Sequence, residues 1–146
     1  MTESARGMNK ATGIGLLGLG VVGSAVANVI IDRHRPEDPS IPLNVVTAVV
    51  RDIERTRSVD LDRSAISTDP ESVIANPAVG IVVELMGGEE PAFDYITTAL
   101  KAGKHVVTAN KEVMCKRGSE LLATAAENNV QLFYEAEATS YRSGRA

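Results

Sequence analysis

The fold is decided by residues 13–30, which run "GIGLLGLGVVGSAVANVI". A short apolar run leads into three glycines in the spacing G-x-G-x-x-G, and a stretch of small and β-branched residues follows. This order predicts a buried strand over residues 14–17, a tight turn, and a helix over residues 21–32. A strand–turn–helix context is the one in which this glycine spacing binds a dinucleotide.

Each glycine of the motif has its own expected task. Gly18 would make the tight turn, Gly20 would let the backbone approach a pyrophosphate, and Gly23 would let the helix lie close to the strand. The free N–H groups at the start of the helix would then face the phosphates. We therefore predict a cofactor-binding loop that consists of Gly18, Leu19, Gly20, Val21, Val22 and Gly23. The alternative is a glycine-rich turn with a purely structural task.

Strands and helices alternate along the rest of the chain. Apolar runs predict further buried strands at residues 43–50, 79–86, 105–109 and 130–136. Between them, proline and capping residues predict helices that begin near Pro70, Pro91 and Lys111, while residues 51–64 are polar and irregular. This alternation predicts an α/β fold of the Rossmann type, a parallel sheet with helices on both faces.

Composition narrows the function classes. The 146 residues suffice for one domain with its own core, and they are 44% hydrophobic. The net charge of −4, without a long basic run, argues against nucleic-acid binding, and the apolar stretches are too short to span a bilayer. A single cysteine, Cys115, fits a reducing compartment. We therefore expect a cytoplasmic protein that acts on small molecules.

The end of the second predicted strand carries the residues that would meet the adenosine end of a dinucleotide. Arg51 and Asp52 follow directly after this strand. An acidic residue here binds the ribose hydroxyls of NAD, whereas an arginine can pair with the 2′-phosphate of NADP. Arg51 favours NADP and Asp52 keeps NAD open, while both could also be exposed loop charges.

Three predicted loops should converge on one crevice, because ligands of open α/β sheets bind beyond the carboxyl ends of the strands. They are the glycine loop, the turn after the third long strand, and the "TANK" stretch at residues 108–111. Thr108 and Asn110 also suit helix capping. The last two loops add to the predicted cofactor-binding set Met86, Gly87, Gly88, Thr108, Asn110 and Lys111.

Lys111 is the predicted catalytic residue. It would lie near a helix N-terminus, where the helix dipole disfavours a cation by about 0.3–1 kcal/mol. The same field favours release of its proton, which suits proton transfer to a reacting group. A lysine kept in an electrostatically poor position indicates a function rather than a solvated side chain.

The remaining candidates carry weaker signals. Glu84 lies in an apolar strand and is a candidate carboxylate at the crevice. His105 begins a strand and Cys115 falls on a helix beside apolar neighbours, so we expect a structural histidine and a packed thiol. Glu135 and Glu137 share one face of the last strand, which indicates a cation site or, more simply, a solvated edge.

Four segments together resemble one enzyme family. They are "GLLGLGVVGSAV", "VVELMGG", "ALKAGKHVVTANKEVM" and "LFYEA". Their order and spacing, from about Gly13 to Ala136, resemble the N-terminal domain of homoserine dehydrogenase. The glycine motif is shared by many enzymes, whereas the pairing of "VVELMGG" with "GKHVVTANK" is much more specific.

The resemblance implies an NADP- or NAD-dependent oxidoreductase of the aspartate pathway, which serves threonine and methionine biosynthesis. Such enzymes interconvert L-aspartate 4-semialdehyde and L-homoserine. It also implies that Arg51 contacts the adenosine ribose or its phosphate, and that Lys111 lies beside the nicotinamide and the reacting carbon. Glu135 resembles the first ligand of a site for a monovalent cation, Na⁺ or K⁺. A small-molecule substrate and a homodimer are the partners implied for the complete enzyme.

The chain departs from the family after Ala136, where "EATSYRSGRA" stands in place of the expected hinge. We therefore expect a disordered lead-in at residues 1–12, an NAD(P)-binding domain at 13–136, and a divergent tail at 137–146 where a substrate and dimerisation domain would follow. Such a chain would bind cofactor with little or no turnover. Two alternatives stay open: a stand-alone nucleotide-binding module, and a related dehydrogenase acting on aspartate semialdehyde or dihydrodipicolinate, against which "VVTANK" weighs.

Overall fold

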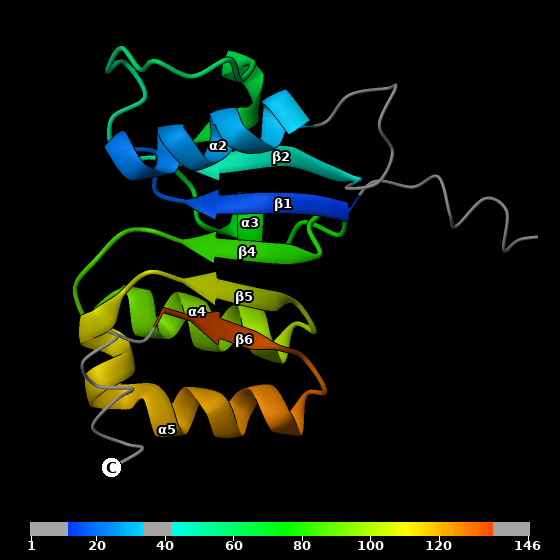
Figure 1. Ribbon diagram of the computed structural model, residues 1–146, viewed down its shortest axis with the longest axis vertical. Coiled ribbons are helices and arrows are strands. Elements are labelled where there is room, and N and C mark those ends of the chain that lie inside the picture. Colours follow the sequence, from blue (N-terminus) through cyan, green and yellow to red (C-terminus); the bar gives the residue numbers. More distant parts are fainter. Residues whose placement is uncertain (1–11, 34–41, 136–146) are drawn as a thin grey trace, which may run out of the picture.

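A computed structural model describes residues 12–33 and 42–135 of the chain (Figure 1). Within them, a six-stranded parallel sheet has the spatial order β3-β2-β1-β4-β5-β6. The strands are β1 (Thr12–Leu17), β2 (Leu43–Val49), β3 (Ile66–Ser67), β4 (Ile81–Glu84), β5 (His105–Thr108) and β6 (Leu132–Tyr134). The helices are α2 (Val21–Arg33), η1 (Arg63–Ala65), α3 (Glu71–Ile74), α4 (Ala92–Lys101) and α5 (Lys111–Glu127). None of these helices combines the length and the apolar character needed to cross a membrane.

Helices cover both faces of the sheet. Successive side chains of a strand point to opposite faces, so each strand contributes to two apolar clusters. On β1, Ile14 and Leu16 pack in a cluster with Ala27 of α2. The neighbouring Leu17 packs in the other cluster, with Ile96 of α4 and Leu121 of α5. This arrangement confirms the predicted Rossmann-type fold.

The strand order reverses between β1 and β4. The chain runs outward from β1 through β2 to β3, then returns to β4 and runs outward through β5 to β6. All strands are parallel, and the arrowheads of the labelled strands in Figure 1 point to one edge of the sheet. At such a reversal the loops diverge and leave a crevice beyond the strand ends, which is where ligands bind in open α/β sheets. The glycine loop after β1 lies at this point.

The structure corrects several predicted boundaries. Thr12 belongs to β1, so the expected lead-in is wrong at that residue, and residues 1–11 and 136–146 lie outside the described part of the chain. The strand β3 was not predicted, because two residues are too short for a periodic pattern and pair only through Ala48 and Val49 of β2. The strands β4 and β6 are shorter than their apolar runs, and only residues 81–84 and 132–134 of those runs pair with β5.

Lys104 is a buried cation at the amino edge of the sheet. Its side chain is 7% exposed, and Nζ donates hydrogen bonds of 2.7 Å to the carbonyl oxygens of Asn76 and Val79. Burial lowers the pKa of this ammonium from its ordinary value of 10.5, because the charged form loses hydration. Lys104 thereby ties the start of β5 to the turn before β4.

We expect Lys104→Met to lower the free energy of unfolding by about 1–3 kcal/mol, because two buried carbonyl groups lose their donor. The folded state holds the Lys104 proton less tightly than the unfolded chain. Stability contributed by this group therefore rises with pH, up to the ordinary pKa. Urea denaturation of the unmodified chain and of Lys104→Met, at about pH 8 and about pH 10, measures their free energies of unfolding. The difference between the two free energies should increase with pH. A constant gap would show that the Lys104 ammonium is as well solvated in the folded state as in the unfolded chain.

Candidate functional site

The turn after β1 requires a glycine at its first position. Gly18 has a φ of +108°, a backbone conformation that other residues rarely adopt. Its N–H donates to the Val49 carbonyl at 3.0 Å, and a Cβ built on it would lie 3.2 Å from the Leu85 carbonyl group. Gly18 therefore turns the chain between the ends of β2 and β4, as predicted.

The other two glycines of the motif have different surroundings. A Cβ on Gly23 would lie 2.5 Å from the carbonyl oxygen of Gly18, so the first turn of α2 packs directly on the glycine loop. A Cβ on Gly20 would meet nothing within 4 Å. The protein itself therefore does not require a glycine at position 20, and the space above it is open for a ligand to approach the backbone.

A cleft of about 590 Å³ opens beside this loop, at the carboxyl ends of β1, β2 and β4. It is lined by the glycine loop, by the segment after β2, and by Leu85, Pro91 and Tyr95 beyond β4. The cleft brings together five of the predicted cofactor-binding residues: Gly18, Leu19, Gly20, Arg51 and Met86. The predicted meeting of loops at one crevice is confirmed for the glycine loop and the turn after β4, whereas no residue of the stretch 108–111 lines this cleft.

The other predicted loop residues lie at the same edge but do not line this cleft. Val21 and Val22 stand in the first turn of α2 and are 85% and 59% exposed. Gly87 and Gly88 follow Met86, are exposed, and both have a positive φ. Exposed apolar side chains and open glycine backbone at this edge leave room for the remainder of an extended ligand.

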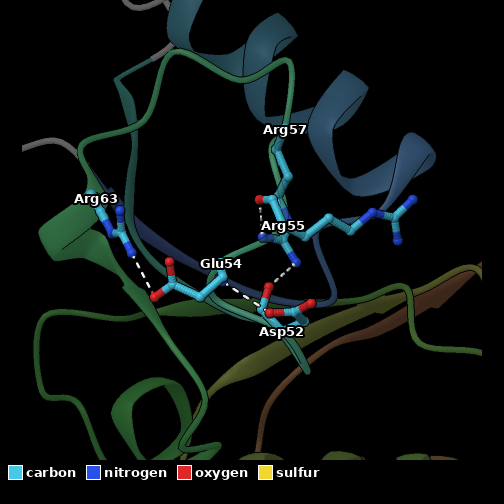
Figure 2. A network of polar contacts seen from close by, with 5 residues as sticks. All are labelled: Asp52, Glu54, Arg55, Arg57 and Arg63. Carbon is cyan, nitrogen blue, oxygen red and sulfur yellow. Dashed lines mark hydrogen bonds and ion pairs between the residues drawn. The ribbon is translucent and has the colours of Figure 1, made fainter.

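Arg57 connects the segment after β2 to the glycine loop (Figure 2). Its Nε donates to the Leu19 carbonyl at 3.1 Å, and its two terminal nitrogens donate to the carbonyls of Arg55 (2.9 Å) and Asp52 (2.7 Å). One guanidinium thus binds three backbone carbonyl groups. This arrangement fixes the position of the segment after β2 relative to the glycine loop, and both line the cleft.

The same segment presents further charged groups to the cleft. Arg51 and Arg55 are exposed and line it, and their guanidinium groups form no hydrogen bond or ion pair within the described residues. In Figure 2 the Arg55 side chain extends away from the pair formed by Glu54 and Arg63, whose atoms are 2.9 Å apart. Sequence reasoning missed Arg55 and Arg57, although the run "RDIERTR" directly after the second strand carried the signal.

Asp52 also lines the cleft, and its carboxylate is partly engaged. Its Oδ1 accepts the backbone N–H of Glu54 at 3.0 Å, which closes a tight turn after β2. The segment therefore offers a ligand two uncommitted cations and one carboxylate. This balance favours an anionic group such as a phosphate.

The start of α5 carries the predicted "TANK" residues. Asn110 is buried and caps the helix, because its Oδ1 accepts the N–H of Val113 at 3.1 Å. Thr108 is buried at the end of β5, where its hydroxyl accepts the Asn110 N–H at 3.0 Å. Lys111 is exposed and is the first residue of α5, so its predicted position at a helix N-terminus is confirmed.

Among the weaker candidates, the prediction for His105 is confirmed, that for Cys115 is wrong, and the cation site at Glu135 stays open. His105 is structural, because its Nδ1 accepts the N–H of Gln131 at 3.0 Å. Cys115 is exposed rather than packed, because Val113, two residues earlier, faces the core instead. Glu135 is exposed after β6, and residues 12–33 and 42–135 hold no group of three or more metal-binding side chains. Glu137 lies outside the described residues.

Comparison with known proteins agrees with this geometry. The family model "Homoserine dehydrogenase, NAD binding domain" matches residues 18–135. The homoserine dehydrogenase of Bacillus subtilis is 43% identical over 129 residues, which cover 87% of this chain and 30% of that protein. The Synechocystis enzyme is 39% identical over 123 residues, which cover 84% of this chain and 28% of that protein. The chain therefore spans less than a third of these two relatives.

Solved structures show the same likeness. Staphylococcus aureus homoserine dehydrogenase at pH 7.5 superposes with a TM-score of 0.79 and 34% identity, over 86% of this chain and 33% of that one. A hyperthermophilic archaeal homoserine dehydrogenase in complex with NADPH has a TM-score of 0.67 and 26% identity, over 86% and 44% of the two chains. The chain belongs to the family of homoserine dehydrogenase NAD-binding domains.

Proposed function

We propose that this chain binds NADP or NAD at the carboxyl edge of its sheet and supplies the cofactor half of a homoserine dehydrogenase. In the assembled enzyme the reaction would interconvert L-aspartate 4-semialdehyde and L-homoserine. The observation that carries the proposal is the open backbone at Gly20 beside a cleft lined by Arg51 and Arg55. The archaeal relative that was solved with NADPH supports the same class of ligand.

The strand order suggests how such a ligand would lie. The pyrophosphate would meet residues 18–23, where the first N–H groups of α2 are free of helical partners. The adenosine end would extend toward Arg51 after β2. The nicotinamide end would extend the other way, toward the ends of β4 and β5 with Met86, Gly87, Gly88, Thr108 and Asn110. The bound cofactor supplies the hydride of the reaction.

Lys111 is the residue we propose to act on the substrate. It is exposed at the carboxyl edge, in the first turn of α5. As the aldehyde carbon accepts hydride, its oxygen gains negative charge and then a proton. The Lys111 ammonium would stabilise that charge and hold the proton at Nζ. A mutation that removes this group should therefore affect turnover of the assembled enzyme more than cofactor affinity.

Two further assignments stay predictions. Glu135, exposed after β6, would provide the first ligand of a monovalent-cation site in the complete enzyme. A homodimer is likewise proposed for the complete enzyme, and analytical ultracentrifugation of that enzyme would measure it. Both assignments concern the assembled enzyme, of which this chain corresponds to about 30% in its curated relatives.

We expect Arg51→Ala to raise the Kd for NADP⁺ about tenfold or more, because a charge-assisted hydrogen bond to a phosphate contributes about 1.5–3 kcal/mol. The Kd for NAD⁺, which lacks the 2′-phosphate, should change less than about twofold. Isothermal titration calorimetry with both cofactors measures the two constants. The proposed function predicts measurable binding of at least one of them by the unmodified chain, and binding of neither would contradict it.

Arg63→Ala is the matched control for this experiment. It removes an exposed arginine from the same region, but Arg63 pairs with Glu54 and does not line the cleft. Binding of both cofactors by this variant should equal that of the unmodified chain. If Arg51→Ala weakens NADP⁺ and NAD⁺ equally, Arg51 does not contact the 2′-phosphate.

A further inference from the structure

Glu84 is a buried carboxylate whose use the proposed function leaves open. It is the last residue of β4 and is 0% exposed. Its Oε2 accepts the backbone N–H groups of Met86 at 2.7 Å and Gly87 at 3.3 Å. Its Oε1 accepts the Thr108 hydroxyl at 2.6 Å. Both carboxylate oxygens are therefore engaged, and every donor belongs to the carboxyl edge of the sheet.

The contacts of Glu84 continue into a closed network. The Thr108 hydroxyl that donates to Glu84 also accepts the N–H of Asn110 at 3.0 Å. The Asn110 side chain donates to the Gly88 carbonyl at 2.5 Å and accepts the N–H of Val113. The loop at residues 86–88 is thus linked to the turn at residues 108–111 by two routes, one through Glu84 and one through Asn110.

A requirement for stability alone does not explain this choice of residue. Burial of a carboxylate costs free energy even when it is hydrogen-bonded, and an apolar side chain in its place is often neutral or stabilising. The preceding residues of β4, Val82 and Val83, are apolar and buried. What Glu84 provides, and an apolar residue would not, is a fixed position for two loops that carry proposed cofactor-binding residues.

We propose that Glu84 is a positioning residue for the nicotinamide end of the cofactor site. Its carboxylate holds the loop at residues 86–88 in a fixed position relative to the turn that begins α5. The same contacts therefore also fix the position of the Lys111 backbone. This inference rests on the proposed function, because it requires a nicotinamide dinucleotide to lie across the ends of β1, β4 and β5. Glu84 acts through Thr108 and the backbone, not by contact with the reacting atoms.

The test uses Glu84→Gln in the full chain. Glutamine has the same shape, but its NH₂ group cannot accept the hydrogen bonds that one carboxylate oxygen now accepts. The two probes are NADPH and 2′-phospho-ADP-ribose, which is the same molecule without its nicotinamide. We expect the Kd for NADPH to rise about tenfold, while that for 2′-phospho-ADP-ribose changes less than about twofold. Titration calorimetry gives both constants, and thermal unfolding reports on the fold.

Thr108→Val provides a second variant if Glu84→Gln does not fold. It removes the hydroxyl bonded to Glu84 while keeping the shape, and it should reproduce the loss for NADPH alone. Thr108→Ser keeps the hydroxyl and should restore the NADPH affinity. The matched control is Thr97→Val, because the buried Thr97 hydroxyl has no hydrogen-bond partner within the described residues. It should leave both Kd values unchanged.

The outcomes separate the inference from the function on which it rests. If the unmodified chain binds neither probe, the proposed function fails. If it binds both, and neither Glu84→Gln nor Thr108→Val weakens NADPH selectively, the positioning role is overturned while cofactor binding stands. Selective loss of NADPH in either variant, with rescue by Thr108→Ser, supports the positioning role.

Discussion

Gly20→Val is expected to lower the affinity for NADP⁺ and NAD⁺ at least about 100-fold while the chain stays folded. A Cβ at this position meets no protein atom within 4 Å, and its backbone has no positive φ, so the folded chain accommodates valine. The Ser24 N–H donates to the Gly20 carbonyl at 2.9 Å, which makes Gly20 the N-cap residue directly before α2. Loss of glycine at such a cap costs about 1 kcal/mol or less.

The added isopropyl group would instead occupy the space through which a pyrophosphate approaches the backbone. Titration calorimetry measures the affinity, and urea denaturation followed by circular dichroism measures the stability. Ala123→Val is the control, because it adds bulk to an exposed position of α5 that does not line the cleft. Unchanged binding by Gly20→Val would show that the glycine loop does not hold the phosphates.

Gly23→Val is expected to have the opposite profile, with a loss of about 3 kcal/mol or more in the free energy of unfolding. Its Cβ would lie 2.5 Å from the carbonyl oxygen of Gly18, which is backbone and has little freedom to move aside. Either α2 must shift away from the sheet, or the turn after β1 must open. For a domain whose total stability is about 5–15 kcal/mol, this is a large fraction.

Urea denaturation measures this loss as a shift in the midpoint. Gly20→Ala is the comparison, because it introduces a Cβ three residues earlier into open space and should shift the midpoint only slightly. A midpoint for Gly23→Val equal to that of Gly20→Ala would mean that α2 adjusts without cost. The two variants therefore distinguish two tasks within one motif. Gly20 leaves space for a ligand to approach the backbone, and Gly23 allows α2 to pack on the glycine loop.

Much of the fold could be predicted because its signals are local. The apolar runs at β1, β2, β4 and β5, with Pro91 before α4 and Gly103 after it, indicated alternating strands and helices. Gly103 has a positive φ of 81°, the conformation that ends a helix. Such signals depend on neighbouring residues, so they predict element type and order. They do not predict the two-residue strand β3, which exists only because β2 lies beside it.

The candidate site could be predicted only in part. Gly18, Gly20, Arg51 and Met86 line one cleft as expected, because the carboxyl ends of parallel strands meet at one edge. Cys115 was placed wrongly, because its apolar neighbours in sequence do not share its face of α5. Which face of a helix is buried depends on the orientation of the helix against the sheet.

By itself, the sequence determined the class of fold, the glycine turn between the first strand and its helix, and the family to which the chain belongs. The tertiary structure alone decided that Arg57 binds the Leu19 carbonyl from 38 residues away, and that Glu84 accepts the Thr108 hydroxyl from 24 residues away. Glycine spacing and strand periodicity are properties of consecutive residues, whereas these hydrogen bonds require two distant segments to be brought within about 3 Å. The pairing of β4 with β5 sets Glu84 beside Thr108, and the path of the segment after β2 brings Arg57 to the glycine loop.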